Sequence, residues 1–154
     1  MYQFLLSFHS LFRWLVLIFL LIAIFRAYRG RIRKLSFTSF DSKVMNATVK
    51  VVQLQFTIGI LLYCISPIVR YFLFNFKEAV HIRDIRFFGM EHITVMILAV
   101  GIISIGSEEV KKATGDYTRF KIMSTWFTIG LILILSSIPW SFSPLISRPN
   151  LRLF

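Results

Sequence analysis

The stretch Lys50-Val-Val-Gln-Leu-Gln-Phe-Thr-Ile-Gly59 recurs 71 residues later as Lys121-Ile-Met-Ser-Thr-Trp-Phe-Thr-Ile-Gly130, and each copy runs on through apolar residues towards a proline. Five of the ten aligned positions are identical. A match of this length can arise by chance in a chain rich in Phe and Ile. Its matching place within two apolar stretches favours duplication of one supersecondary unit. The sequence therefore predicts two copies of a helical hairpin.

The composition is that of a membrane protein. Of the 154 residues, 56% are hydrophobic and 17 are Phe, which is more apolar surface than a soluble domain of this size can bury. A helix that crosses about 30 Å of hydrocarbon needs about 20 mostly apolar residues, and helices satisfy their own backbone groups in lipid. We expect an all-α, four-helix transmembrane bundle, a single domain over residues 1–154 built from two parallel-repeat helical hairpins. Its predicted spans are 5–26, 51–72, 87–107 and 122–141.

The net charge of +11 is distributed as an orientation signal, so no nucleic-acid partner is predicted. Eleven Lys and Arg residues fall in the two segments that join the spans within each predicted hairpin, 26–50 and 108–121. Six fall on the opposite side, and Arg13 lies inside the first span. The positive-inside rule places the two basic segments in the cytoplasm and both termini outside.

His9 and His92 lie at corresponding points near the start of the first helix of each predicted hairpin. In a square bundle those two helices are diagonal, so imidazoles at equal heights can face each other. Two neutral imidazoles in an apolar surrounding can be the axial ligands of a b-type haem. Alternatively, each histidine bonds a carbonyl group or water at the membrane interface. An ionisable group inside a span favours the functional interpretation.

Four other charged residues accompany the histidines. Arg13 follows His9 by one helical turn, and we expect it either to pair with Glu91 or to bond a haem propionate. Arg83 and Arg86, in the outer segment, suit either propionates or lipid phosphates.

The glycines that end the repeated strings, Gly59 and Gly130, allow close approach of either a neighbouring helix or the edge of a flat cofactor. The single cysteine, Cys64, excludes an internal disulfide, and no Cys-x-x-Cys-His run is present for a covalent c-type haem. No HExxH motif or glycine-rich phosphate loop is present, so a hydrolase is not expected.

The strings His9-Ser-Leu-Phe-Arg-Trp14 and Ile82-Arg-Asp-Ile-Arg-Phe-Phe-Gly-Met-Glu-His92 resemble a family of small four-span proteins of Bacteroidetes-type bacteria that are often labelled cytochrome b. The resemblance runs over the whole chain. It implies the inner membrane of a Gram-negative cell and haem b as the cofactor. In such a membrane, the outer side on which the charge distribution places both termini is the periplasm. The chain lacks the four membrane histidines of two-haem cytochromes b, so the resemblance implies one haem at most.

The leading hypothesis is an electron-transfer protein that holds one bis-histidine haem b near the periplasmic face, with a quinol as a partner in the lipid bilayer. The alternative is a cofactor-free accessory subunit, whose polar side chains hold it to other subunits of a larger membrane complex. A proton or ion path is the third hypothesis. The lack of charged groups continuing inward from the histidines argues against it.

Overall fold

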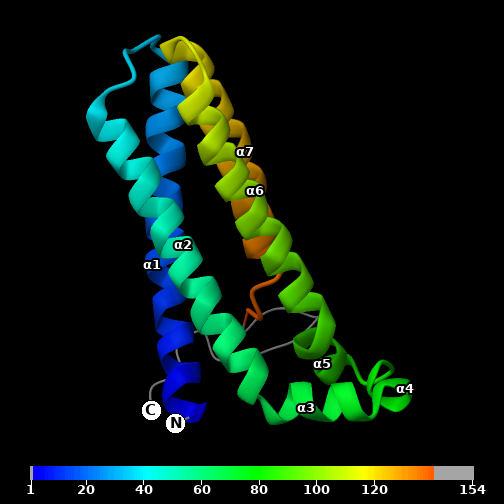
Figure 1. Ribbon diagram of the computed structural model, residues 1–154. Helices are drawn as coiled ribbons and strands as arrows, with labels where there is room; N and C mark the ends of the chain where they lie inside the picture. The colour runs from blue at the N-terminus through cyan, green and yellow to red at the C-terminus, as the bar shows by residue number, and fades with distance from the viewer. Residues whose placement is uncertain (1, 141–154) are drawn as a thin grey trace.

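The computed structural model describes residues 2–140 of the chain, and every regular element in that range is helical (Figure 1). Four helices are long: α1 (Tyr2–Ile32), α2 (Ser39–Ile65), α6 (His92–Lys112) and α7 (Asp116–Ser136). Between α2 and α6 lie α3 (Pro67–Phe74), α4 (Phe76–Ala79), α5 (Arg83–Arg86) and a π-helical turn, η1 (Phe87–Glu91). The predicted all-α four-helix bundle is confirmed.

Within the described range, four helical stretches are long and apolar enough to cross a membrane, the third of which joins α5, η1 and α6. Large apolar side chains on their outer faces are exposed, among them Leu21, Leu54, Leu98 and Ile132, each more than half exposed. A water-soluble monomer does not expose apolar surface on every side, whereas lipid covers such surface. The chain is a multi-pass membrane protein.

The second span ends earlier than predicted, because α2 ends at Ile65 and not near residue 72. Pro67 cannot continue the helix and forces Ser66 into an extended conformation (ψ 125°). The Ser66 side chain then accepts a hydrogen bond from the Val69 backbone N–H (3.4 Å), so a new helix begins in a new direction. Figure 1 shows α3 and α4 running across the end of the bundle. The fourth predicted span, 122–141, ends in the structure at Ser136, and residue 141 lies outside the described part.

The long helices form a four-membered ring. Helix α1 packs against α2 and α7, and α6 packs against α2 and α7, which puts α1 and α6 on one diagonal, as predicted. The α1–α2 and α6–α7 connections lie at one end of the bundle, here called the loop end, and the N-terminus lies at the other, here called the cavity end (Figure 1). The two hairpins therefore enter from the same end.

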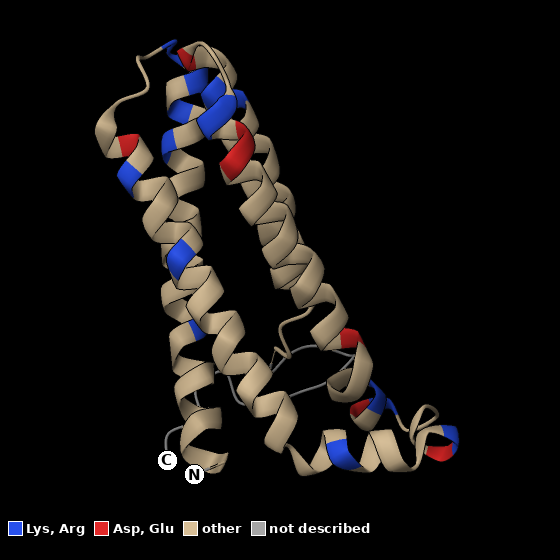
Figure 2. Ribbon diagram, in the orientation of Figure 1, with Lys and Arg blue, Asp and Glu red and all other residues tan. Residues whose placement is uncertain are grey.

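The charged residues of the spans are concentrated at the loop end and around α3 to α5, with a mostly uncharged belt between them (Figure 2). At the loop end the helices approach closely, because small residues face bulky ones. The ring of Phe120 occupies the space where Gly30 would carry a side chain, and Trp126 does the same at Gly106. Phe120 is 2% exposed and belongs to the main core.

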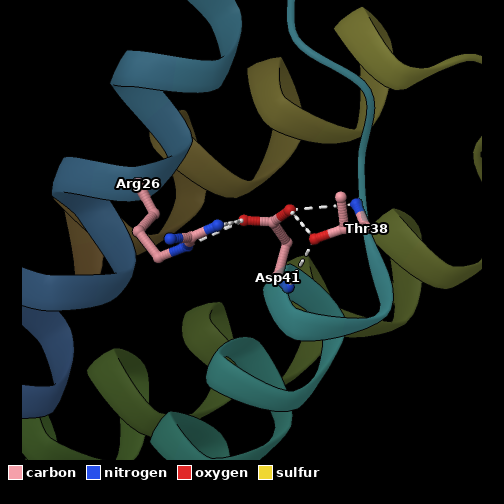
Figure 3. A network of polar contacts seen from close by, with 3 residues as sticks. All are labelled: Arg26, Thr38 and Asp41. Carbon is pink, nitrogen blue, oxygen red and sulfur yellow. Dashed lines mark hydrogen bonds and ion pairs between the residues drawn. The ribbon is translucent and has the colours of Figure 1, made fainter.

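An ion pair closes the first hairpin at the loop end (Figure 3). Asp41 Oδ1 accepts from Arg26 Nε (2.8 Å) and Nη2 (2.7 Å), while Oδ2 accepts from the Thr38 hydroxyl (2.6 Å) and backbone N–H (2.9 Å). Thr38 Oγ1 in turn accepts from the Asp41 backbone N–H (3.4 Å), which completes a capping box. The Asp41 side chain is 4% exposed, so this network fixes both the start of α2 and its height against α1.

Candidate functional site

A cavity of about 160 Å³ lies at the cavity end, lined by residues of α1, α2, α3, η1, α6 and α7. Its lining is mainly apolar and includes no acidic side chain from the described residues. The predicted ligands His9 and His92 both line it, from the diagonal helices α1 and α6. The other polar or ionisable side chains that line it are Tyr2, Arg13, Gln55, Tyr63 and Ser66.

The imidazole of His92 is oriented by the end of α7. Its Nδ1 lies 2.8 Å from the backbone oxygen of Ser137 and 3.2 Å from the Ser137 hydroxyl. Because a carbonyl oxygen can only accept, Nδ1 carries the hydrogen. In the neutral ring the lone pair is then on Nε2, which is the arrangement found in metal-bound histidines. His92 is therefore prepared to act as a ligand or a hydrogen-bond acceptor through Nε2.

His9 is held through its backbone instead. Gln55 Nε2 on α2 donates to the His9 carbonyl oxygen (2.9 Å). Within the described part of the chain, His9 Nδ1 and Gln55 Oε1 are both buried without a hydrogen-bond partner. A buried polar atom without a partner costs about 1–3 kcal/mol, and such an atom in a protein commonly bonds a ligand or an ordered water. Two such atoms on neighbouring residues mark this wall as the part of the cavity where a polar group is expected.

The predicted ion pair between Arg13 and Glu91 is wrong. Glu91 Oε1 lies 2.6 Å from Arg86 Nε, and both side chains are more than a third exposed. Successive helical residues point about 100° apart, so with His92 turned into the bundle its neighbour Glu91 is turned towards the outer surface. Arg13 does lie at the cavity, one turn from His9, and its guanidinium carbon is 5.6 Å from the centre of the Trp14 ring.

The two outer arginines stand away from the cavity. Arg86 bonds Glu91 and also donates to the Val80 carbonyl oxygen (3.2 Å), and Arg83 is exposed. Neither residue lines the cavity. Their role at haem propionates stays a prediction.

The two repeat glycines occupy different surroundings. Gly59 lines the cavity, and a Cβ placed there would lie 3.2 Å from His9 Cε1. Gly130 faces α6, where a Cβ would collide with Ile103. The reason is register: Gly59 is the twenty-first residue of α2, whereas Gly130 is the fifteenth of α7, which is closer to the loop end by between one and two turns. Gly130 therefore permits helix packing, and only Gly59 is placed to leave room at the site.

Three contributors to the site were not predicted from the sequence. They are the Ser137 carbonyl, the Tyr63 hydroxyl and the π-helical turn before His92. The first had a signal, because the Pro139 that follows cannot extend α7 and a helix end leaves carbonyl groups without intrahelical donors. A π-helical turn and a bond between α2 and η1 depend on tertiary packing and have no local signal.

The described residues contain no group of three or more His, Cys, Asp and Glu side chains arranged for a metal ion. A site for a bare metal ion would need such a group, whereas a haem iron takes four nitrogens from its porphyrin and needs only two from the protein.

Compared with protein-family models, curated proteins and solved structures, the chain has no match in any of the three.

Proposed function

We propose that this protein is an electron-transfer protein of a bacterial inner membrane that holds one haem b between His9 and His92. The supporting observation is that two diagonal helices bring both imidazoles to one apolar cavity, where Ser137 fixes His92 so that Nε2 carries the lone pair. The haem, when bound, supplies the one-electron chemistry. The chain supplies the two nitrogen ligands and a lining that excludes water.

The two imidazoles, His9 and His92, are a ligand set that suits haem b. The volume of the cavity, however, limits what can bind in it. A volume of about 160 Å³ is close to that of an engineered protein cavity that takes up benzene, and it is smaller than a porphyrin. Haem binding therefore requires this cavity to be wider than it is in the structure. The buried Nδ1 of His9, which has no partner among the described residues, is available to an added polar group.

The second candidate is a cofactor-free accessory subunit of a larger membrane complex. The contact between His92 and Ser137 favours it, because a polar bond between α6 and α7 can serve packing alone. The small cavity volume also favours it.

An absorption spectrum separates the two candidates. We expect detergent-purified protein to show a reduced-minus-oxidised haem b band, which His9→Ala and His92→Ala each remove. His81→Ala is the control, because His81 is exposed in the segment between α4 and α5. A wild-type protein without the band, or a band that survives both cavity variants, would rule out the proposed haem site. Only the first of these results agrees with the cofactor-free accessory subunit.

For orientation we propose a cytoplasmic loop end and periplasmic termini, supported by the excess of basic residues near the α1–α2 and α6–α7 connections. Alkaline phosphatase, which folds in the periplasm, tests it as a fusion partner. A fusion after Val80 should be active and one after Ser36 inactive, and the reverse result would invert the topology. With the haem on the periplasmic side, a bilayer-soluble quinol is the electron donor we propose.

A further inference from the structure

The five residues before α6, Phe87–Glu91, form a π-helical turn in which the His92 backbone N–H bonds to the carbonyl oxygen of Phe87, five residues back. A π-helical turn accommodates one residue more than an α-helical turn; such turns are rare and are frequently found at functional sites. Here it stands directly before a histidine that lines the cavity.

Two side chains from outside the turn hold it. The Tyr63 hydroxyl on α2 donates to the Gly89 carbonyl oxygen (2.8 Å). The ring of Phe72 on α3 fills the space where a side chain at Gly89 would lie, so only glycine allows this approach. Phe72 is 4% exposed, which makes this a packed contact.

The π-helical turn also positions two aromatic rings around His92. The ring centres of Phe87 and Phe88 lie 5.7 Å and 6.4 Å from that of His92. Removing the extra residue of the turn would rotate both phenylalanines by about 100° relative to α6. The imidazole would then keep its bond to Ser137 but lose the rings that restrict its rotation.

We infer that Tyr63 is a positioning residue for His92: its bond to Gly89 holds the π-helical turn, and the turn places the Phe87 and Phe88 rings that, together with the Ser137 bond, restrict rotation of the imidazole. This inference rests on the proposed function in one respect: binding of a ligand by His92 is the reason for holding its imidazole in place. The contacts themselves lie within the chain and involve no ligand atom.

The test uses Tyr63→Phe in the full-length protein in lipid nanodiscs, with Tyr71→Phe as the matched control, because Tyr71 is an exposed tyrosine on α3. Loss of the hydroxyl leaves the Gly89 carbonyl without this donor, so we expect amide hydrogen exchange across Phe87–His92 to become about tenfold faster. Histidine-labelled protein should also show a shifted ring nitrogen resonance for His92, with that of His81 unchanged. The control should match the wild type in both measurements.

Unchanged exchange and an unchanged His92 resonance in Tyr63→Phe would overturn the inference. A second pair of variants covers the case in which Tyr63→Phe does not insert. Gly89→Ala alone should disturb the turn, and Gly89→Ala combined with Phe72→Ala should bring exchange back towards the wild-type rate, because the smaller side chain vacates the space. A double variant no closer to wild type than Gly89→Ala would contradict the proposed packing.

These outcomes are separate from those of the haem experiment. A wild-type protein without a haem band refutes the proposed function, but it leaves the effect of Tyr63 on His92 measurable. A haem band combined with an unaltered Tyr63→Phe variant refutes the inference and leaves the proposed function standing.

Discussion

The loop end and the cavity end of the bundle are built on opposite principles. At the loop end, small residues admit close packing, and the buried carboxylate of Asp41 has a donor for each oxygen. At the cavity end, α2 breaks at Ser66, a π-helical turn interrupts the third span, and His9 Nδ1 and Gln55 Oε1 lack partners within the described part. The difference indicates that the loop end supplies most of the stability, while the cavity end retains unfavourable features that a ligand would offset.

The largest expected effect is at the loop end. Asp41→Ala should lower the free energy of unfolding by about 3 kcal/mol, because it leaves the partly buried Arg26 without its countercharge and removes the capping box. Chemical denaturation in mixed micelles measures it. Glu108→Ala is the matched control, since its pair with Lys111 is exposed and should contribute less than about 1 kcal/mol. Equal effects of the two substitutions would show that the Arg26–Asp41 network contributes no more than an exposed ion pair at the same end.

The repeat glycines give the next effect in size. Gly130→Ala should cost about 2 kcal/mol, because its Cβ meets Ile103 in the packed α6–α7 contact. Gly59→Ala should cost less than about 1 kcal/mol, since its Cβ stands 3.2 Å from one His9 atom beside a cavity. Thermal unfolding in detergent measures both. Gly101→Ala, with open space around its Cβ, is the control and should not destabilise the protein.

A smaller effect distinguishes the two histidines in the absence of a ligand. His92→Leu should cost about 1–2 kcal/mol, because the Ser137 carbonyl loses its donor. His9→Leu should be close to neutral, since it removes a buried nitrogen that has no partner among the described residues. The same unfolding measurement applies. A large loss for His9→Leu would mean that its ring has a structural role at the cavity end.

The smallest effect should come from the exposed pairs of α6. Lys112→Gln breaks the ion pair between Lys112 and Glu109 (3.0 Å). Both side chains are exposed, so the free energy of unfolding should change by no more than about 0.5 kcal/mol. Melting temperatures of the wild type and the variant should coincide within error. A clear loss would mean that surface pairs, and not only the Arg26–Asp41 network, stabilise the loop end.

The fold was predictable because its determinants are local. About 20 apolar residues make a span, and the Lys and Arg residues mark the connections, so α1, α6 and α7 were each found, although most of their predicted ends lie five or six residues from the observed ones. The end of α2 was misplaced because the apolar run continues through Pro67, and hydropathy does not register a change of direction. Pro67 itself was the signal that the helix ends there.

The site was predictable only in part. The pairing of His9 with His92 followed from the duplicated pattern, and both residues line one cavity. Gly59 and Gly130 are equivalent in the repeated sequence, but their surroundings in the structure differ, because the two hairpins pair their helices in different registers. The partner of Glu91 was missed because an unpredicted π-helical turn changes which residues of that segment face inward.

The pairing of Arg26 with Asp41 also bears on how the chain enters the bilayer during synthesis. The partners are only 15 residues apart, so the first hairpin can close as soon as α2 emerges, without waiting for α6 or α7. Because each neutralises the other, the pair also lowers the cost of burying the Asp41 carboxylate between α1 and α2. The first two helices would then reach the membrane as one preassembled unit, against which the second hairpin docks.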